Sequence, residues 1–242
     1  MTGPGLSRTA RPRRRPGAAH TGLLAMEAPR ASIELGALAA AAPFLAAGPR
    51  GDGHSVLVLP GLFGGDRSTL LLRRYLRWLN YSVSGCGLGA NVGPTEAVLS
   101  GLRARLEQLA QDSGRPVSLV GWSLGGIYAH ELARRAPGSV RQVLTLGSPV
   151  RSARRAPASP GSQARPLRVP ATAVYTRSDA IVRWQSCLLR PGKRRENVEV
   201  YGSHCGLGHN PAVLHVLADR LAQGDQSWRP FAPRALVRHA FP

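Results

Sequence analysis

The sequence has few aromatic side chains and no long apolar run. Phe, Trp and Tyr make up 5% of the 242 residues, so a core must rest mainly on aliphatic side chains. No stretch of eighteen uninterrupted apolar residues occurs, and the sequence therefore predicts no transmembrane helix. At 43% apolar residues, the chain is long enough to form one domain with a substantial core.

Cysteine is also scarce, because the chain contains only Cys86, Cys187 and Cys205. An odd and small number of cysteines argues against a disulfide framework. One bridge, between Cys187 and Cys205, and two reduced thiols both fit the sequence. The histidines and cysteines show no paired-ligand spacing, so we expect no metal site and no cofactor.

Acidic residues are few, 13 against 32 basic ones, and the net charge is +19. Such a balance brings nucleic acid or an anionic membrane surface into consideration as a partner. Lys193 is the only lysine, and many arginines fall in residues 1–15 and 151–168, outside the expected core. We therefore interpret most of the charge as solvated. Peripheral contact with an anionic membrane is the alternative, and nucleic acid is disfavoured.

The amino-terminal residues lack the features of a targeting segment. Residues 1–25 are rich in Arg, Pro and Gly, and no apolar stretch follows the arginines, as a signal peptide would require. Met26 is an alternative start of the chain. We expect a cytoplasmic monomer, with membrane association as the alternative.

Apolar runs alternate with amphipathic segments along the chain. Six strands are expected at 55–59, 81–85, 116–121, 140–146, 169–175 and 198–201. Helices are expected at 32–47, 70–79, 93–111, 123–136 and 210–221. This alternation predicts an α/β fold, a mainly parallel sheet with helices on both faces.

The sequence divides into four parts. Residues 1–30 are expected to be a disordered Arg/Pro-rich tail, 31–50 an N-terminal helix, and 51–222 a single α/β domain. Residues 223–242 form a C-terminal tail that either straps across the surface or is loose. Inside the domain, the Arg- and Pro-rich segment 151–167 indicates an open loop.

The most informative motif is Gly121-Trp122-Ser123-Leu124-Gly125. A Gly-x-Ser-x-Gly pattern alone is weak, because it arises by chance in roughly one chain in five of this composition. Here it stands where an expected strand passes abruptly into an expected helix. Such a turn exposes the serine at the carboxyl end of the strand. Ser123 is therefore the candidate nucleophile.

A serine hydroxyl needs a base, and the base needs a group that orients it. Asp179 follows the strand expected at 169–175 and is the candidate acid. His204 follows the last expected strand and is the candidate base, with His209 as the alternative. His130, inside the helix after Ser123, is expected to pack or to donate a structural hydrogen bond.

Oxyanion donors should come from backbone N–H groups. One belongs to Leu124, the residue after the nucleophile. The other is expected in the glycine-rich loop after the first strand, where Gly61 permits an unusual turn and Leu62 supplies the N–H, with Phe63 as the alternative. Proximity to these motifs makes Leu62, Phe63, Trp122 and Ile181 the candidate residues of an acyl pocket.

Six ordered motifs together resemble the bacterial lipase-like and esterase-like α/β-hydrolases. They are VLPG (58–61), GLGANVGP (87–94), LVGWSLGG (119–126), LGSP (146–149), YTRSDAIV (175–182) and GSHCGL (202–207). The resemblance covers about residues 51–221 and implies the α/β-hydrolase fold, carboxylic-ester hydrolysis and a triad of Ser123, Asp179 and His204. Members of this family often carry a helical cap where this chain has the short loop 151–167, so we expect a short or absent cap and an open site.

Three functions remain open at this point. The leading hypothesis is an esterase or lipase that acts through an acyl-enzyme on Ser123. An acyltransferase or a thioesterase would use the same triad. A non-catalytic protein that binds anionic lipid or nucleic acid through its arginines belongs to a different class.

Overall fold

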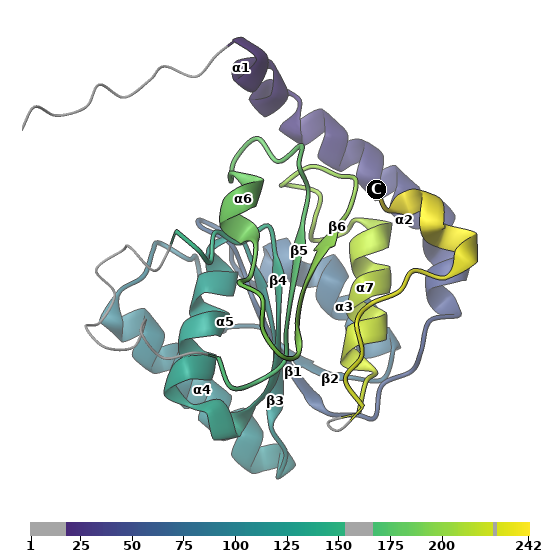
Figure 1. The fold of residues 1–242 in the computed structure, drawn as a ribbon. Helices are drawn as coiled ribbons and strands as arrows, with labels where there is room; N and C mark the ends of the chain where they lie inside the picture. Colours follow the sequence, from purple (N-terminus) through teal and green to yellow (C-terminus); the bar gives the residue numbers. More distant parts are fainter. Residues whose placement is uncertain (1–17, 153–166, 225–226) are drawn as a thin grey trace, which may run out of the picture.

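The computed structural model describes residues 18–152, 167–224 and 227–242. Its centre is a six-stranded, wholly parallel sheet in the order β2-β1-β3-β4-β5-β6, with helices on both faces (Figure 1). The strands are β1 Ser55–Leu59, β2 Ser82–Ser84, β3 Val117–Trp122, β4 Val140–Leu146, β5 Ala171–Tyr175 and β6 Arg195–Glu199. The predicted fold class is therefore confirmed.

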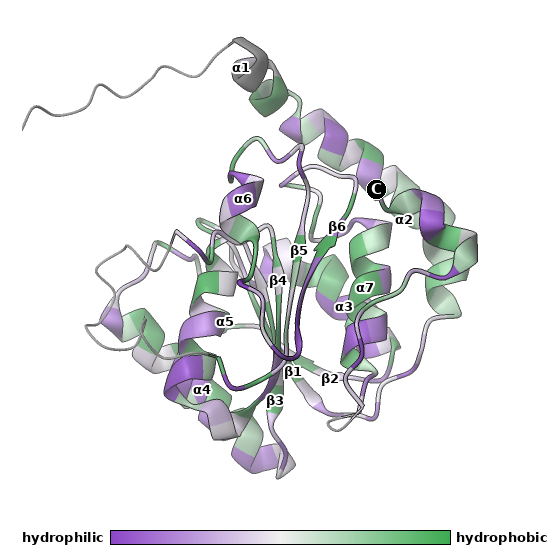
Figure 2. Ribbon diagram, viewed as in Figure 1, coloured by the Kyte–Doolittle hydropathy of each residue, from purple (hydrophilic) through white to green (hydrophobic). Residues whose placement is uncertain are grey.

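The inner strands are apolar because helices cover both of their faces. All five residues of β1 are buried; Val56 and Val58 pack into one side of the core, whereas Leu57 and Leu59 pack into the other. β6 differs because it lies at the sheet edge, and most of its ribbon is hydrophilic in Figure 2. This polar edge strand was predicted at 198–201, whereas in the structure it begins three residues earlier, at Arg195, and ends two residues earlier, at Glu199.

Two helical layers enclose the sheet. Helices α2 Glu27–Ala46, α3 Leu70–Trp78 and α7 Pro211–Leu221 cover one face, and α4 Glu96–Ser113 and α5 Leu124–Arg135 cover the other (Figure 1). The short elements are α1 Ala18–Ala25, α6 Trp184–Cys187, η1 Asp66–Thr69, η2 Pro137–Ser139 and η4 Ala235–Ala240.

Local signals fix the ends of the long helices. The Thr95 side chain accepts a hydrogen bond from the Val98 N–H at the start of α4, and Gly114 ends that helix in the left-handed conformation. Asn210 accepts from the first N–H groups of α7, and Pro211 occupies the first helical position.

The strand order reverses direction at β1. From β1 the chain passes through α3 to β2 on one side, then returns through α4 to β3 on the other side. Parallel sheets bind ligands outside the carboxyl ends of the strands at such a reversal. The loop after β1 and the turn after β3 meet at this point.

The expectation of disorder up to residue 30 is wrong for the residues that the structure describes there. Residues 18–25 form α1, and α2 begins at Glu27 rather than at residue 31 or 32. Contacts that are distant in sequence stabilise this earlier start, since Glu27 and Arg30 hydrogen-bond with residues beyond 175. Residues 1–17 lie outside the described part of the chain.

The C-terminal segment straps across the surface over residues 227–242, the first of the two predicted alternatives. The rings of Phe231 and Phe241 pack against each other and against His215 of α7 in tilted and edge-on arrangements. The expected open loop at 151–167 falls largely on residues 153–166, which lie outside the described residues.

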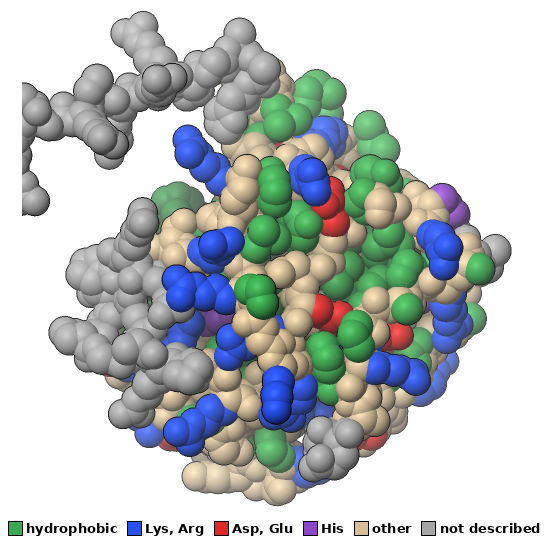
Figure 3. Space-filling model, viewed as in Figure 1, with side chains coloured by type: hydrophobic (Ala, Val, Ile, Leu, Met, Phe, Trp, Pro, Cys, Tyr) green, Lys and Arg blue, Asp and Glu red, His purple; other side chains and the backbone are tan. Residues whose placement is uncertain are grey.

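On the face drawn in Figure 3, the Lys and Arg side chains of the described residues are spread over several places rather than gathered in one patch. Among the described helices, none is both long enough and apolar enough to cross a membrane.

His130 is buried in α5 and was expected to pack or to donate a hydrogen bond. It packs: within the described residues neither ring nitrogen has a hydrogen-bond partner. Burial first, and the nearby Arg134 and Arg195 second, lower the pKa of His130 to about 3. Between about pH 6.5 and pH 3, the imidazole is therefore neutral in the native protein. In the unfolded chain, where its pKa is about 6.5, it is protonated over the same range.

We predict that His130→Leu weakens the acid sensitivity of folding. A lowered histidine pKa contributes stability that is present above about pH 6.5 and is lost as pH falls below it. Between pH 6.5 and 4.5, urea unfolding should show the wild type losing about 2 kcal/mol more than His130→Leu. His239→Leu, at an exposed position, serves as control. Equal losses in wild type and His130→Leu would contradict a neutral buried imidazole.

Candidate active site

Ser123 occupies the turn between β3 and α5. Its backbone has φ 53° and ψ −119°, a conformation that non-glycine residues rarely adopt and that the surrounding structure must hold. The Ser123 N–H donates to the Leu146 carbonyl at 2.8 Å, which ties the turn to the end of β4. Ser123 is partly exposed at the carboxyl edge of the sheet.

The glycines beside Ser123 allow the helix to approach the sheet. A Cβ added at Gly125 would lie 2.1 Å from the Leu59 carbonyl oxygen, and one added at Gly121 would lie 2.4 Å from Gly126. These contacts are with backbone, which cannot move aside as a flexible side chain can. The pattern Gly-x-Ser-x-Gly is thus required here by packing as well as by the turn.

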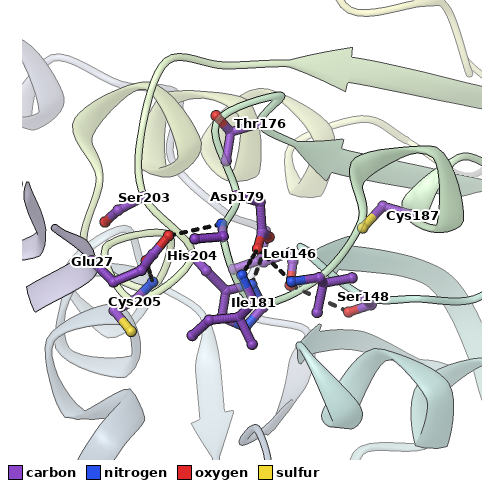
Figure 4. Close-up of polar contacts among 12 residues, drawn as sticks. Glu27, Leu146, Ser148, Thr176, Asp179, Ile181, Cys187, Ser203, His204 and Cys205 are labelled. Atoms are coloured by element: carbon purple, nitrogen blue, oxygen red, sulfur yellow. Dashed lines mark hydrogen bonds and ion pairs between the residues drawn. The ribbon is translucent and has the colours of Figure 1, made fainter. Parts of the chain in front are cut away.

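Asp179 and His204 lie together at the ends of two neighbouring strands, β5 and β6. The Asp179 Oδ2 to His204 Nδ1 distance is 2.6 Å, and both residues are buried, at 9% and 5% exposure (Figure 4). Asp179 Oδ1 accepts from the Ile181 and Val182 N–H groups at 2.9 and 2.6 Å. The carboxylate is therefore held on one side by its own loop and presents its other oxygen to the imidazole.

Two contacts join this pair to the Ser123 turn. The indole N–H of Trp122, the residue before Ser123, donates to the His204 carbonyl at 3.2 Å. Gly147, next to the Leu146 carbonyl that accepts from Ser123, lies so close that an added Cβ would be 3.1 Å from His204 Nδ1. The structure thus brings the loops of all three candidate residues to one edge of the sheet.

The loop after β1 faces Ser123. A Cβ added at Gly61 would lie 3.1 Å from the Ser123 Cβ. The Phe63 N–H donates to the Asn91 carbonyl at 2.7 Å, so this alternative oxyanion donor is already engaged. Within residues 18–152, 167–224 and 227–242, neither the Leu62 nor the Leu124 N–H donates a hydrogen bond.

His209, the alternative base, contacts a different element. Its Nε2 lies 2.8 Å from the Ala31 carbonyl of α2, whereas Asp179 contacts His204. No signal in the sequence distinguishes a histidine that anchors a helix from one that faces a site. Among the described residues, no group of three His, Cys, Asp or Glu side chains is arranged to hold a metal ion.

The disulfide considered between Cys187 and Cys205 is not formed, since both are free thiols. Figure 4 shows them on opposite sides of the Asp179–His204 pair. Burial raises the pKa of Cys187 to about 12, and burial followed by the Glu27 carboxylate raises the pKa of Cys205. A thiol must ionise to act as a nucleophile, so neither cysteine competes with Ser123.

A second Ser–His–Asp arrangement lies at the opposite end of the sheet. His54 Nδ1 contacts Asp52, and its Nε2 lies 2.8 Å from the Ser118 Oγ. His54 and Ser118 are fully buried, and Ser118 lies within β3 rather than in an exposed turn. Burial lowers the pKa of His54. This arrangement ties β1 to β3 and offers no access to a substrate.

Three of the four candidate pocket residues are exposed apolar side chains. Leu62, Phe63 and Ile181 are exposed, and Trp122 is partly buried against Gly208. Leu62 and Phe63 follow β1, and Ile181 follows Asp179. The carboxyl edge of the sheet therefore carries apolar surface next to the polar pair.

Sequence reasoning missed three charged residues of α2 that contact the loops of Asp179 and His204: Glu27, Arg30 and Glu34. Their spacing of three and four residues, which places them on one helix face, was the available signal. It was overlooked because residues up to 30 were assigned to a disordered tail.

We predict that Gly125→Ala destabilises the fold even though alanine favours helices. The added methyl group would overlap the β1 backbone, so the free energy of unfolding should fall by at least about 3 kcal/mol, measured by urea unfolding. Gly138→Ala is the control, because an added Cβ there meets nothing within 4 Å. Gly125→Ala with wild-type stability would show that the turn does not pack this closely.

Comparison with known proteins adds to this geometry. No protein-family model and no curated sequence matches the chain. Similar solved structures include the metagenome-derived lipolytic enzymes LipS and LipT, with a TM-score of 0.53, 14% identity, and coverage of 72% of this chain and 93% of that chain.

Two further structures are also similar. Mouse alpha/beta hydrolase domain-containing protein 10 has a TM-score of 0.50 and 16% identity, over 71% of this chain and 89% of that one. Est1E from Butyrivibrio proteoclasticus has a TM-score of 0.51 and 13% identity, over 69% and 86%. The likeness is one of architecture, and with the parallel sheet between two helical layers it shows that this chain has the α/β-hydrolase fold.

Proposed function

We propose that the protein is a serine hydrolase that cleaves carboxylic esters, with Ser123 as nucleophile, His204 as base and Asp179 as the orienting acid. The observation that carries the proposal is the buried 2.6 Å contact between Asp179 and His204 beside the strained turn that holds Ser123. The lipolytic enzymes among the structural neighbours support the same reaction class at the level of the fold.

The first half of the reaction forms an acyl-enzyme. Ser123 Oγ attacks the ester carbonyl carbon while His204 Nε2 takes its proton, and Asp179 holds the imidazole in the required tautomer and stabilises the imidazolium. The carbonyl oxygen becomes an oxyanion that accepts from the Leu62 and Leu124 N–H groups. The intermediate collapses, and the alcohol leaves with the proton from His204.

The second half repeats these roles with water. His204 Nε2 removes a proton from a water molecule, whose oxygen attacks the acyl carbon of the Ser123 ester. The same two N–H groups hold the second oxyanion. Collapse returns the proton to Ser123 Oγ and releases the carboxylic acid.

The exposed apolar side chains favour an ester with an apolar acyl group. Leu62, Phe63 and Ile181 present apolar surface beside the reacting groups, and covering it with an acyl chain removes that surface from water.

The exposed Arg67 and Arg183 follow Phe63 and Ile181 closely in the sequence. Peripheral contact of this edge with an anionic membrane is part of the proposal.

The main test is hydrolysis of p-nitrophenyl butyrate by single variants. Ser123→Ala and His204→Ala should each lower kcat at least about 10³-fold, because nucleophile and base act as a unit. His209→Ala, which loses only its contact with α2, should stay within about threefold of the wild type. Wild-type activity in Ser123→Ala, or equal losses in the two histidine variants, would contradict these assignments.

A second test concerns the acyl chain. Phe63→Ser should raise the KM for a decanoate ester about three- to tenfold and leave kcat/KM for an acetate ester unchanged, since only the longer chain reaches that side chain. Leu24→Ser in α1, which projects from the body in Figure 1, is the matched control. If the ratio of the KM for the decanoate ester to the KM for the acetate ester is the same in the wild type, Phe63→Ser and Leu24→Ser, then Phe63 is not part of the acyl site.

A further inference from the structure

Helix α2 crosses the loops that carry Asp179 and His204. Its amino-terminal half passes over the carboxyl ends of β5 and β6 (Figure 1). Three charged side chains, Glu27, Arg30 and Glu34, extend from it toward these loops and bond with their backbone.

Glu27 joins the two loops through one carboxylate. Its Oε1 accepts from the Ala180 N–H at 3.0 Å, and its Oε2 accepts from the Cys205 N–H at 3.0 Å (Figure 4). Ala180 follows Asp179, and Cys205 follows His204. A single side chain, 4% exposed, thus fixes the backbone next to the acid and next to the base.

Glu34 holds the other side of His204. Its Oε1 accepts from the Ser203 N–H at 2.6 Å, and its Oε2 accepts from the Asn210 side-chain amide at 2.8 Å. The N–H groups before and after His204 therefore both bond with carboxylates of α2.

Arg30 lies between the two carboxylates and completes the contact. Its guanidinium donates to the Ser178 carbonyl at 2.9 Å, to the Ser178 Oγ at 2.7 Å and to the Gly202 carbonyl. It lies 3.8 Å from Glu27, so the buried negative charge has a positive partner. Ser178 precedes Asp179, and Arg30 also spans both loops.

Helix α2 also docks through apolar side chains. The carboxyl-terminal half of the helix already packs apolar side chains, Leu38, Ala41, Phe44 and Leu45, into the core. Burying charged groups costs desolvation energy and is weak evidence for stability. The polar contacts instead fall on the backbone that flanks Asp179 and His204, the proposed orienting acid and base.

We propose that Glu27 is a positioning residue for the reaction, which sets the distance between the acid loop and the base loop, assisted by Arg30 and Glu34. The inference rests on the proposed function, because it takes Asp179 and His204 as the acid and the base. A carboxylate matches two converging N–H donors with two acceptor oxygens and strengthens both hydrogen bonds through its charge. Misplacement of catalytic groups by 1 Å can cost about 10²-fold in rate.

The test is Glu27→Gln, which keeps the shape of the side chain. The glutamine oxygen can accept from one of the two N–H groups, but its NH₂ group then opposes the other. We expect kcat for p-nitrophenyl butyrate to fall about 10- to 100-fold while KM stays within about twofold. Glu107→Gln, an exposed ion-pair residue on α4, controls for the lost charge and should keep the wild-type kcat.

Phe44→Ala separates positioning from docking, because Phe44 packs at the other end of the same helix. We expect it to lower Tm more than Glu27→Gln does and to leave kcat unchanged below the transition. A proton NMR resonance of the His204–Asp179 hydrogen bond should be sharp in the wild type and in Phe44→Ala, and broadened or lost in Glu27→Gln.

The outcomes separate this inference from the proposed function. If Ser123→Ala is inactive but Glu27→Gln keeps the wild-type kcat and the proton resonance, the positioning role is wrong and the ester hydrolase stands. If Phe44→Ala loses as much kcat as Glu27→Gln, the helix acts only through docking and the inference is overturned. If Ser123→Ala retains activity, the proposed function itself fails, and the resonance still reports whether Glu27 orders the pair.

Discussion

The first turn of α5 lies so close to the backbone of β1 and β3 that no side chain fits between them. Gly121 and Gly125 provide that space, since a Cβ at either of them would overlap backbone atoms. The close approach leaves Ser123 with a positive φ of 53° at the sheet edge, where the strand order reverses. What matters for Asp179 and His204, which lie at the same edge, is where their side chains stand relative to Ser123.

The proposed acid and base reach the same edge by a different principle. Asp179 and His204 stand in loops after β5 and β6, and loops have few packing constraints of their own. Hydrogen bonds hold these loops in place. Asp179 accepts from N–H groups of its own loop, and carboxylates of α2 accept from the N–H groups on both sides of His204. A rigid apolar turn thus faces a pair held by polar contacts from a distant segment of the chain.

The sequence predicted the buried part of the fold well and the polar part less well. β4 was predicted at its observed bounds because a strand covered on both faces is a continuous apolar run. β6 was misplaced because only Val198 of this edge strand is buried. Asp179 and His204 were chosen as candidates because each follows an expected strand, and the structure brings their side chains within 2.6 Å of each other. The role of Glu27 was missed, and the predicted start of α2 was several residues too late. Both depend on contacts with residues about 150 to 180 positions away in the sequence, which no local pattern reveals.

If the Asp179–His204 pair activates a serine, that serine is Ser123 and no other. Reaction with an organophosphorus fluoridate, followed by intact mass and peptide mapping, identifies the activated residue. We expect one phosphoryl group per chain, bound to Ser123, and no labelling of His204→Ala over the same time. An unmodified wild-type chain, or a phosphoryl group on another residue such as Ser118 of the buried second arrangement, would contradict this assignment.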